Sequence, residues 1–201
     1  KFQKSDGMFP DVIWNSGEVE DRFTKPPVLA AASVVVYKHC GDKDFLKNVY
    51  PQLTAAEGFW TKKRYFDGMF HYDSQDKGEK DYIKHVMFES GWDNSVRWDK
   101  TITDLWPIDL NCFAVAEYRA LSFIAAELGL PAEKAQRLTA LINERLWDSE
   151  NRYYADTNRF TGEMSDVLSP ASFMPLYINI ADDEQAAAMA ELAETRFCGK
   201  M

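Results

Sequence analysis

The sequence lacks a long hydrophobic segment and contains few cysteines. No apolar run approaches the roughly 20 residues that a membrane span requires, so we expect no membrane partner. Its cysteines, Cys40, Cys112 and Cys198, are odd in number and have no metal-ligand spacing, so we expect buried free thiols rather than a disulfide framework. These features leave the compartment open between cytoplasm and periplasm.

Positive charge is scarce as well. The chain has 23 Lys and Arg against 32 Asp and Glu, and its formal net charge of -9 argues against a nucleic-acid partner, which requires clustered basic residues. Neither a glycine-rich phosphate loop nor a Gly-x-Ser-x-Gly nucleophile motif is present. A neutral or polar small molecule remains the expected ligand.

Histidine is also rare: the chain has 3, and they lack the spacing of metal ligands. His39 closes a predicted buried helix, where a core or cap role is expected. His71 and His85 lie in a long connection and are candidates for lining the mouth of a site. We predict no metal ion and no cofactor.

What the sequence does contain is a repeated pairing of helices. Residues 28–36 are apolar except at Ser33, which predicts a helix buried on all sides. Residues 43–59 carry apolar side chains at helical spacing with lysines opposite, which predicts a half-exposed helix. The pairing recurs twice more, and the predicted helices are 26–40, 43–63, 109–128, 132–147, 171–180 and 183–197.

Short aromatic segments follow the first two pairs, at residues 65–72 and 146–154, and predict hairpins or loops. Repeated pairs with apolar inner members are typical of an α/α toroid or an α-solenoid, because each inner helix must be buried against its neighbours. The spacing is irregular, with a long connection at 64–109, and this favours an enzyme toroid over a regular binding solenoid.

The connection at 64–109 concentrates aromatic and acidic residues. It holds three of the six tryptophans, Trp92, Trp98 and Trp106, together with Glu89, Asp93, Asp99, Asp104 and Asp109. Aromatic faces pack on sugar rings, and carboxylates bind hydroxyl groups or act as the acids and bases of glycosidic cleavage. The segment therefore predicts a carbohydrate site.

Two other interpretations of this segment stay open. An acidic aromatic loop can be a solvated cover whose tryptophans close the end of a helical core. Alternatively, Glu89, Asp93 and Asp99 could bind calcium, although the loop lacks the D-x-D-x-D-G spacing of the familiar calcium loop.

The segment Glu89-Ser90-Gly91-Trp92-Asp93-Asn94-Ser95, followed by Arg97-Trp98, resembles the E-S-G-W-D-x-S signature of the family 63 glycoside hydrolases and the related family 37 trehalases. The resemblance implies an all-α catalytic domain, an (α/α)6 toroid. It also implies an inverting, exo-type cleavage of an α-glycosidic bond in a glucoside or mannosyl derivative, with Asp93 as the general acid. An oligosaccharide or small glycoside is then the expected substrate.

Weaker matches follow in the family's order, at Lys25-Pro26-Pro27, Pro107-Ile108-Asp109-Leu110-Asn111 and Ser172-Phe173-Met174-Pro175-Leu176. Two positions depart from the pattern. Lys25 stands where related enzymes often have a glutamine near the sugar, and Val96 stands where many have proline. The first departure concerns the substrate, and the second concerns the stiffness of the loop.

The resemblance makes several neighbours of Asp93 candidate substrate-binding residues: Trp92, Gly91, Arg97, Trp98, Glu89, Lys25 and Asp109. We expect burial between Trp92 and Trp98 to favour the protonated carboxyl that a general acid requires.

More than one role is possible for several of these neighbours. Arg97 should contact a substrate hydroxyl or Glu89, with a structural loop clamp as the alternative. Asp109 either orients the site or caps a helix. Gly91 permits either a close approach of the backbone or a turn.

An inverting glycosidase also needs a second carboxylate as base. In the resembling families this base is a glutamate beyond the third helical pair, so we expect it to lie beyond Met201. Residues 1–201 are then a partial catalytic (α/α)6 domain, the first half of the toroid, with the C-terminal half and any N-terminal β domain outside it.

Three further expectations follow. The remainder of the domain is the partner of this fragment, which alone should be inactive and expose an apolar edge along its last helical pair. A trehalase is the alternative activity. A non-catalytic helical-repeat module that binds carbohydrate or protein is the alternative from another class.

Overall fold

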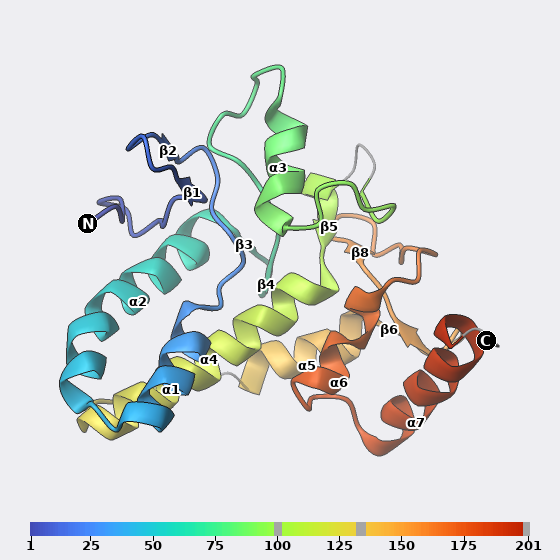
Figure 1. Ribbon diagram of the computed structural model, residues 1–201. Helices are drawn as coiled ribbons and strands as arrows, with labels where there is room; N and C mark the ends of the chain where they lie inside the picture. Colours follow the sequence, from blue (N-terminus) through green and yellow to red (C-terminus); the bar gives the residue numbers. More distant parts are fainter. Residues whose placement is uncertain (99–101, 132–135, 199–201) are drawn as a thin grey trace.

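The computed structural model describes residues 1–98, 102–131 and 136–198 of the chain. Helices dominate it, and the strands are short (Figure 1). Within those ranges, no helix combines the length and the apolar character needed to cross a membrane.

The first helical pair follows a small hairpin. The hairpin strands β1 (Val12–Ile13) and β2 (Val19–Glu20) are antiparallel, and they precede α1 (Leu29–Cys40) and α2 (Lys43–Lys63). Gly41 ends α1 in the left-handed conformation, which glycine adopts without steric cost. The carboxylate of Asp42 then accepts the backbone N–H groups of Asp44 and Phe45 and starts α2. Both helices were predicted, although α1 begins after its two prolines.

The second and third pairs also have their predicted order. They consist of α4 (Ile108–Leu128) with α5 (Gln136–Arg145), and of α6 (Met174–Tyr177) with α7 (Asp183–Leu192). The predicted start of α5, at residues 132–135, lies outside the described residues. The inner helix of the third pair is much shorter than predicted, because a 3-10 turn at Pro170–Phe173 replaces its first half. At α7, Asp182 forms a full capping box with Gln185, and a π turn (Ala193–Phe197) continues the helix.

The aromatic segments after the first two pairs are hairpins, as predicted. Strand β3 (Tyr65–Phe66) pairs with β4 (Met69–Phe70), and β6 (Trp147–Asp148) pairs with β7 (Tyr153–Tyr154).

The long connection between the first two pairs is more ordered than predicted. It contains α3 (Tyr82–Ser90), a 3-10 turn (Ile102–Asp104) and β5 (Leu105–Trp106), which pairs with the distant β8 (Thr157–Asn158). No helix was predicted within this connection, so α3 was missed. Its end at Gly91 places the motif segment at the foot of a helix. Figure 1 shows α3 standing above the N-terminal end of α4.

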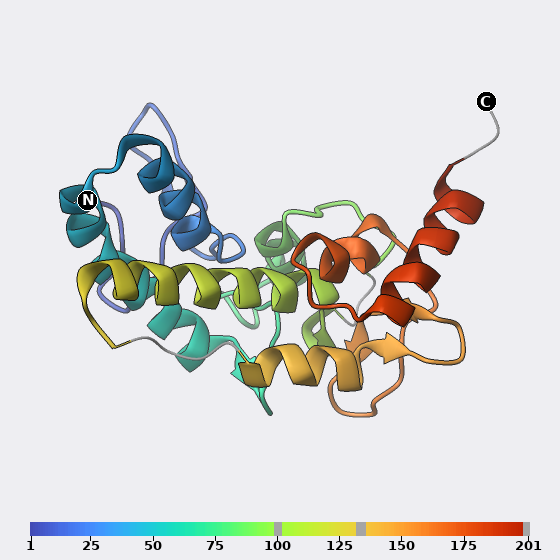
Figure 2. The ribbon, with the colours of Figure 1, turned by 90° about the horizontal axis from the view of Figure 1, so that it is seen from below.

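Helix α4 is the centre of the fold. It contacts α1 and α2 in one direction and α5 and α6 in the other (Figures 1 and 2). Most of its apolar side chains are buried, as expected for an inner helix. Among its buried polar side chains, Glu117 reaches another helix: its carboxylate accepts the backbone N–H groups of Ala30 and Ala31 at the start of α1. Since α1 has no cap of its own, Glu117 supplies one from the neighbouring helix.

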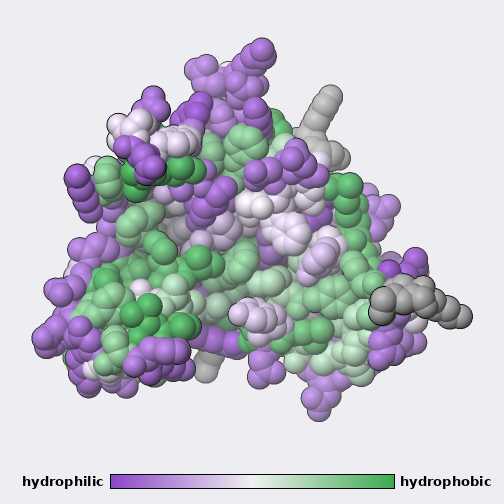
Figure 3. All heavy atoms as spheres, viewed as in Figure 1, coloured by the Kyte–Doolittle hydropathy of each residue, from purple (hydrophilic) through white to green (hydrophobic). Residues whose placement is uncertain are grey.

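Helix α1 corrects the prediction of all-round burial. Only Ala30 and Val34 are buried in it, whereas Val35 is 58% and Val36 49% exposed. The apolar face that they share is visible as green surface over α1 in Figure 3. An exposed apolar edge was predicted along the last helical pair, and Tyr177 and Phe197 are exposed there. Exposed aliphatic side chains also occur on α1, at Val35 and Val36, where none were predicted.

All three cysteines are free, as expected. Only Cys112 is buried, so the prediction of buried thiols was wrong for Cys40 and Cys198, which are exposed.

Candidate active site

The first acidic residue of the motif, Glu89, lies in the last turn of α3 and is completely buried. Its carboxylate accepts two hydrogen bonds from the guanidinium of Arg64, at 2.9 and 3.0 Å, and one each from the backbone N–H groups of Asp73 and Thr24. Burial raises the pKa of Glu89, and Arg64 opposes this increase. Glu89 therefore joins three chain segments, and its oxygens are not accessible to a substrate.

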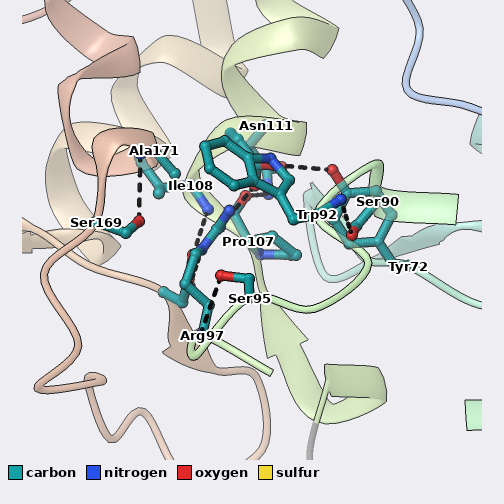
Figure 4. Close-up of polar contacts among 12 residues, drawn as sticks. Tyr72, Ser90, Trp92, Ser95, Arg97, Pro107, Ile108, Asn111, Ser169 and Ala171 are labelled. Carbon is teal, nitrogen blue, oxygen red and sulfur yellow. Dashed lines mark hydrogen bonds and ion pairs between the residues drawn. The ribbon is translucent and has the colours of Figure 1, made fainter. Parts of the chain in front are cut away.

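Ser90 and Gly91 turn the chain out of α3. Gly91 has a φ of 74°, and a Cβ there would meet open space, so the residue serves the turn rather than a close approach. The hydroxyl oxygen of Ser90 accepts the backbone N–H of Trp92 at 3.0 Å and the indole N–H of Trp98 at 3.1 Å. Ser90 thereby holds both tryptophans of the motif near the end of α3. Figure 4 shows the contact with Trp92.

Arg97 forms the second buried charge cluster. Its Nε and Nη2 donate to Asp156 at 2.9 and 2.7 Å, and Nη2 also donates to Asp109 at 2.8 Å. The indoles of Trp98 and Trp92 lie over the guanidinium, with ring centroids 4.2 and 5.3 Å from Cζ. Figure 4 shows Arg97 reaching from the loop toward the start of α4, with Trp92 beside it. The expected contact with Glu89 is wrong, and the structural clamp describes Arg97 best.

Burial and charge act on Arg97 in opposite directions. Burial lowers the pKa of the guanidinium, but the carboxylates of Asp109 and Asp156 outweigh it, so the pKa of Arg97 lies above its ordinary value. Arg97 is therefore a permanent cation in this cluster.

Asp109 and Asp156 bind Arg97 from two different elements. Asp109, in the first turn of α4, also accepts the hydroxyl of Tyr72 at 3.2 Å, and its side chain is completely buried. The predicted cap at Asp109 is absent. Instead, Asp156 accepts the backbone N–H of Ile108 at 2.9 Å and caps α4 from the segment after β7. The start of α4 is thus fixed to the motif loop by three charged side chains.

Asn111, in the first turn of α4, is hydrogen-bonded to the first aromatic hairpin. Its Oδ1 accepts the backbone N–H of Phe70 at 2.8 Å, and its Nδ2 donates to the carbonyls of Phe70 and Pro107.

Asp93 differs from the other acidic residues of the motif. It lies on an exposed turn, and its carboxylate accepts no hydrogen bond from the described part of the chain. The expectation that Asp93 is buried between Trp92 and Trp98 is therefore wrong: Trp92 is half-buried and Trp98 is buried against Tyr72, but Asp93 itself stays outside this packing. Asp99, the other candidate in this loop, lies outside the described residues.

Lys25 stands close to the end of α3. Its ammonium forms an ion pair with Asp11 at 3.3 Å and donates to the carbonyl of Phe88. Its side chain is 43% exposed, so the ammonium remains partly accessible.

Two cavities flank this region. One, of about 270 Å³, is lined by residues that include Asp11, Lys25 and Trp60, and the other, of about 490 Å³, by residues that include Arg97, Asn158 and Asp166. Asp93 lines neither of them.

The histidines take structural positions. His39 is exposed, with Nδ1 3.1 Å from the carbonyl of Val35 in its own helix. His71 and His85 are buried, His71 beside the carbonyl of Tyr72 and His85 against Asp76 and the ring of Phe23. Neither is among the residues that line the two cavities. No group of three potential metal ligands occurs among the described residues.

Residues 1–201 match the family model described as the mannosylglycerate hydrolase MGH1-like glycoside hydrolase domain. The chain belongs to this family.

Solved structures show the same fold as this MGH1-like domain. The family 63 mannosylglycerate hydrolase from Thermus thermophilus, in complex with glucose, has 20% sequence identity and a TM-score of 0.78 over 96% of this chain and 60% of its own. Its complex with Tris and D-glycerate has 18% identity and a TM-score of 0.80 over 96% and 62%. The neutral trehalase from Saccharomyces cerevisiae has 19% identity and a TM-score of 0.74 over 86% and 44%.

These matches confirm the expected family and the all-α fold of the toroid type. The chain spans about 60% of the length of the mannosylglycerate hydrolase that it resembles.

Two residues of the MGH1-like site were not recognised from the sequence. Ser90 is part of the quoted motif, and its role as an acceptor for two N–H groups was not inferred. Asp156 lies 59 residues from Arg97 and carries no local signal beyond its position after an aromatic hairpin.

Proposed function

We propose that the protein is an inverting, exo-type α-glycoside hydrolase that acts on a glucoside or a mannosyl derivative, with Asp93 as its general acid. The base is a glutamate in the part of the catalytic domain that follows residue 201. Residues 1–201 supply the first half of the toroid and the acid.

The observation that carries this proposal is the difference between Asp93 and its acidic neighbours. Glu89 is bound to Arg64, and Asp109 is bound to Arg97 and Tyr72, so neither can transfer a proton to a substrate. Among these three, only Asp93 is exposed, and its carboxylate accepts no hydrogen bond from the residues that the structure describes. Because Ser90 and Arg97 fix the chain on both sides of it, Asp93 is presented on a short, anchored loop.

Substrate contacts are assigned to the accessible neighbours. The half-buried Trp92 can pack against a sugar face, and the ammonium of Lys25 can donate to a hydroxyl or an anionic group. Gly91 and the buried Trp98, Arg97, Glu89 and Asp109 hold the loop in place.

The most direct test removes the proton from Asp93. In the full-length enzyme, Asp93→Asn should lower kcat by a factor on the order of 10²–10⁴, the range for losing a general acid. The matching glycosyl fluoride needs little protonation of its leaving group and should lose much less. Asp81→Asn, an exposed aspartate at the other end of α3, is the control and should keep wild-type rates with both substrates.

Equal losses on the glycoside and the fluoride would show that Asp93 is not the acid. Proton NMR of the released sugar should show the inverted anomer first, as an inverting mechanism requires.

The substrate is identified by a panel. Mannosylglycerate, after which the related Thermus enzyme is named, is compared with trehalose, kojibiose and nigerose. Preferential cleavage of trehalose would assign the protein to the trehalases. Binding without hydrolysis of any glycoside would favour a non-catalytic carbohydrate-binding module.

A further inference from the structure

The smaller of the two cavities that flank the site, of about 270 Å³, lies between the N-terminal segment, the start of α1 and the second half of α2. Most of its lining is apolar and includes the buried side chains of Met8, Phe59 and Trp60. A mostly apolar cavity with a few convergent polar groups is the usual form of a site for a small molecule. The polar groups of this cavity therefore indicate which ligand it fits.

Three carboxylates of the described residues line the cavity, and two of them accept hydrogen bonds from the chain. Glu117 caps α1, and Glu57 accepts the hydroxyls of Thr61 and Tyr118. Asp11 differs from them: its side chain is only 9% exposed, and its Oδ1 has no hydrogen-bond partner among the described residues. A buried acceptor without a donor is costly, so a ligand that supplies the donor recovers this energy on binding.

Asp11 is fixed in position by the backbone and paired with Lys25. It directly precedes β1, and its backbone N–H donates to the carbonyl of Glu20 in the partner strand at 2.8 Å. The ammonium of Lys25 lies 3.3 Å from Oδ1 of Asp11 but does not make a well-directed hydrogen bond to it. Opposite charges are thus adjacent in the cavity wall, and a bridging group can still bond to both.

The ammonium of Lys25 has donors to spare. It carries three N–H groups, and one of them donates to the carbonyl of Phe88 in the last turn of α3. Its side chain is 43% exposed and has a flexible stem, so the ammonium can turn from Asp11 toward a ligand. Figure 1 shows the segment between β2 and α1, which carries Lys25, passing beside the foot of α3. The Asp11–Lys25 pair therefore connects the cavity to the helix that precedes the motif.

A hydroxyl group suits this pair better than a charged group does. A carboxylate only accepts hydrogen bonds and an ammonium only donates them, whereas a hydroxyl does both. An anion at the pair would be attracted by Lys25 and repelled by Asp11. A neutral sugar ring has adjacent hydroxyls on its edge and C–H groups on its faces, so it fits both the pair and the apolar lining.

We propose that this cavity is a subsite for one neutral hexopyranose ring, and that Asp11 and Lys25 determine its specificity. Oδ1 of Asp11 accepts a sugar hydroxyl, and Lys25 donates to the same hydroxyl or to its neighbour. This inference rests on the proposed function for the identity of the ligand as a sugar. Asp11 contacts the sugar and takes no part in proton transfer.

The test is direct binding of sugars to the full-length enzyme by calorimetric titration, which requires no catalysis. The probes are D-glucose and D-mannose, followed by the monodeoxy derivatives of whichever binds more tightly. Asp11→Asn keeps the shape of the side chain and removes its charge, and it should weaken binding of that hexose about 10-fold. Lys25→Met removes the donor at similar length and should weaken binding by a similar factor.

The deoxy sugars distinguish a contact from a supporting role. In the wild-type enzyme, removal of the hydroxyl that binds Asp11 should weaken binding about 10- to 100-fold. The same deoxy sugar should bind Asp11→Asn with little further loss, because the contact is already weakened. If Asp11 only supported the hairpin, the variant would weaken every sugar by the same factor, and this result would overturn the inference.

Two matched controls use neighbouring positions, and the folding of each variant is checked by its Tm. Asp21→Asn changes a half-exposed aspartate of the same segment that pairs with Lys4, so it should keep wild-type affinity. Ala56→Leu adds bulk at the α2 wall of the cavity and should weaken binding at least about 10-fold. Ala55→Leu, at the exposed adjacent position outside the lining, should bind as wild type.

Wild-type affinity for the hexose in both Asp11→Asn and Lys25→Met would overturn the inference. Binding of D-glycerate in place of the hexoses, lost in Lys25→Met, would also overturn it, because the pair would then form an anion site. The role of Asp93 is tested separately by Asp93→Asn with the fluoride substrate. Because sugar binding is measured without turnover, failure of that role and failure of this subsite are recognised independently.

Discussion

Arg97 holds the site together at the scale of single residues. Its guanidinium is buried with two carboxylates and lies beneath two indoles, so it ties the motif loop to α4 and to the segment after β7. Removing one partner of a buried ion pair is costly because the other partner stays buried and uncompensated. The cluster is therefore most sensitive to truncation of its single cation.

We expect Arg97→Met to lower the free energy of unfolding of the full-length enzyme by about 3–5 kcal/mol, because Asp109 and Asp156 then remain buried without a cation. Denaturant unfolding measures this loss. Arg145→Met is the control, since its pair with the exposed Asp67 contributes about 0–1 kcal/mol. Equal losses in the two variants would contradict a special role for the buried cluster.

His71 gives the fold a pH dependence on its acidic side. Burial, followed by the charge of Arg159, lowers the pKa of His71 to about 4 from its ordinary 6.5. The unfolded chain therefore binds this proton more readily than the folded chain between these values. The stabilisation is complete above about pH 6.5 and is lost as the pH falls toward 4.

We expect His71→Gln to flatten the change in the free energy of unfolding between about pH 6.5 and 4 by roughly 2–3 kcal/mol. Chemical unfolding at a series of pH values measures the difference from wild type. His39→Gln, at an exposed helix position, should retain the wild-type slope. A wild-type slope in His71→Gln would show that another group controls stability in this range.

At the scale of elements, α1 is the helix whose environment differs most from its sequence pattern. Val35 and Val36 form an exposed aliphatic surface on a helix that was predicted to be fully buried. In a closed ring, such an inner helix would have a neighbour on that side. We propose that the rest of the catalytic domain covers this face.

Residues 1–201 expressed alone should then self-associate through α1, because a contiguous apolar surface is exposed to water. Replacing Val35 and Val36 together by lysine should shift the species toward monomer in size-exclusion chromatography with light scattering. Val96→Lys, at a side chain that is 83% exposed in the motif loop, is the control. Association that is unaffected by the α1 substitutions would place the contact elsewhere.

The sequence predicted those elements whose ends are marked locally. The predicted ends next to Gly41 and Asp182 agree with the structure, because a left-handed glycine and a capping box depend on neighbouring residues alone. Helix α3 was missed because the connection that contains it was interpreted from its tryptophans and carboxylates, most of which follow this helix. Asp156 was missed because its partner Arg97 is distant in sequence, and such pairings leave no periodic signal.

The burial of Asp93 was mispredicted for a related reason. The sequence places Trp92 and Trp98 on either side of it, but Ser90 binds both indole-bearing residues and packs them inward. Asp93 is therefore not enclosed by the two tryptophans that flank it in the sequence. The identity of the motif was therefore predictable, whereas the direction in which each side chain faces was not.

At the scale of the whole molecule, the hydrogen bonds from Ala30 and Ala31 to Glu117 have a consequence for synthesis on the ribosome. The acceptor for the start of α1 lies 87 residues downstream of Ala30. When α1 emerges from the exit tunnel, its first N–H groups can bind only water, and an isolated helix of 12 residues is marginal. Long-range contacts of this kind form late, after the intervening chain has been made. Glu117, in the middle of α4, must therefore be synthesised before the start of α1 can be capped. A pause in translation before Glu117 would leave α1 uncapped and its apolar face accessible to chaperones.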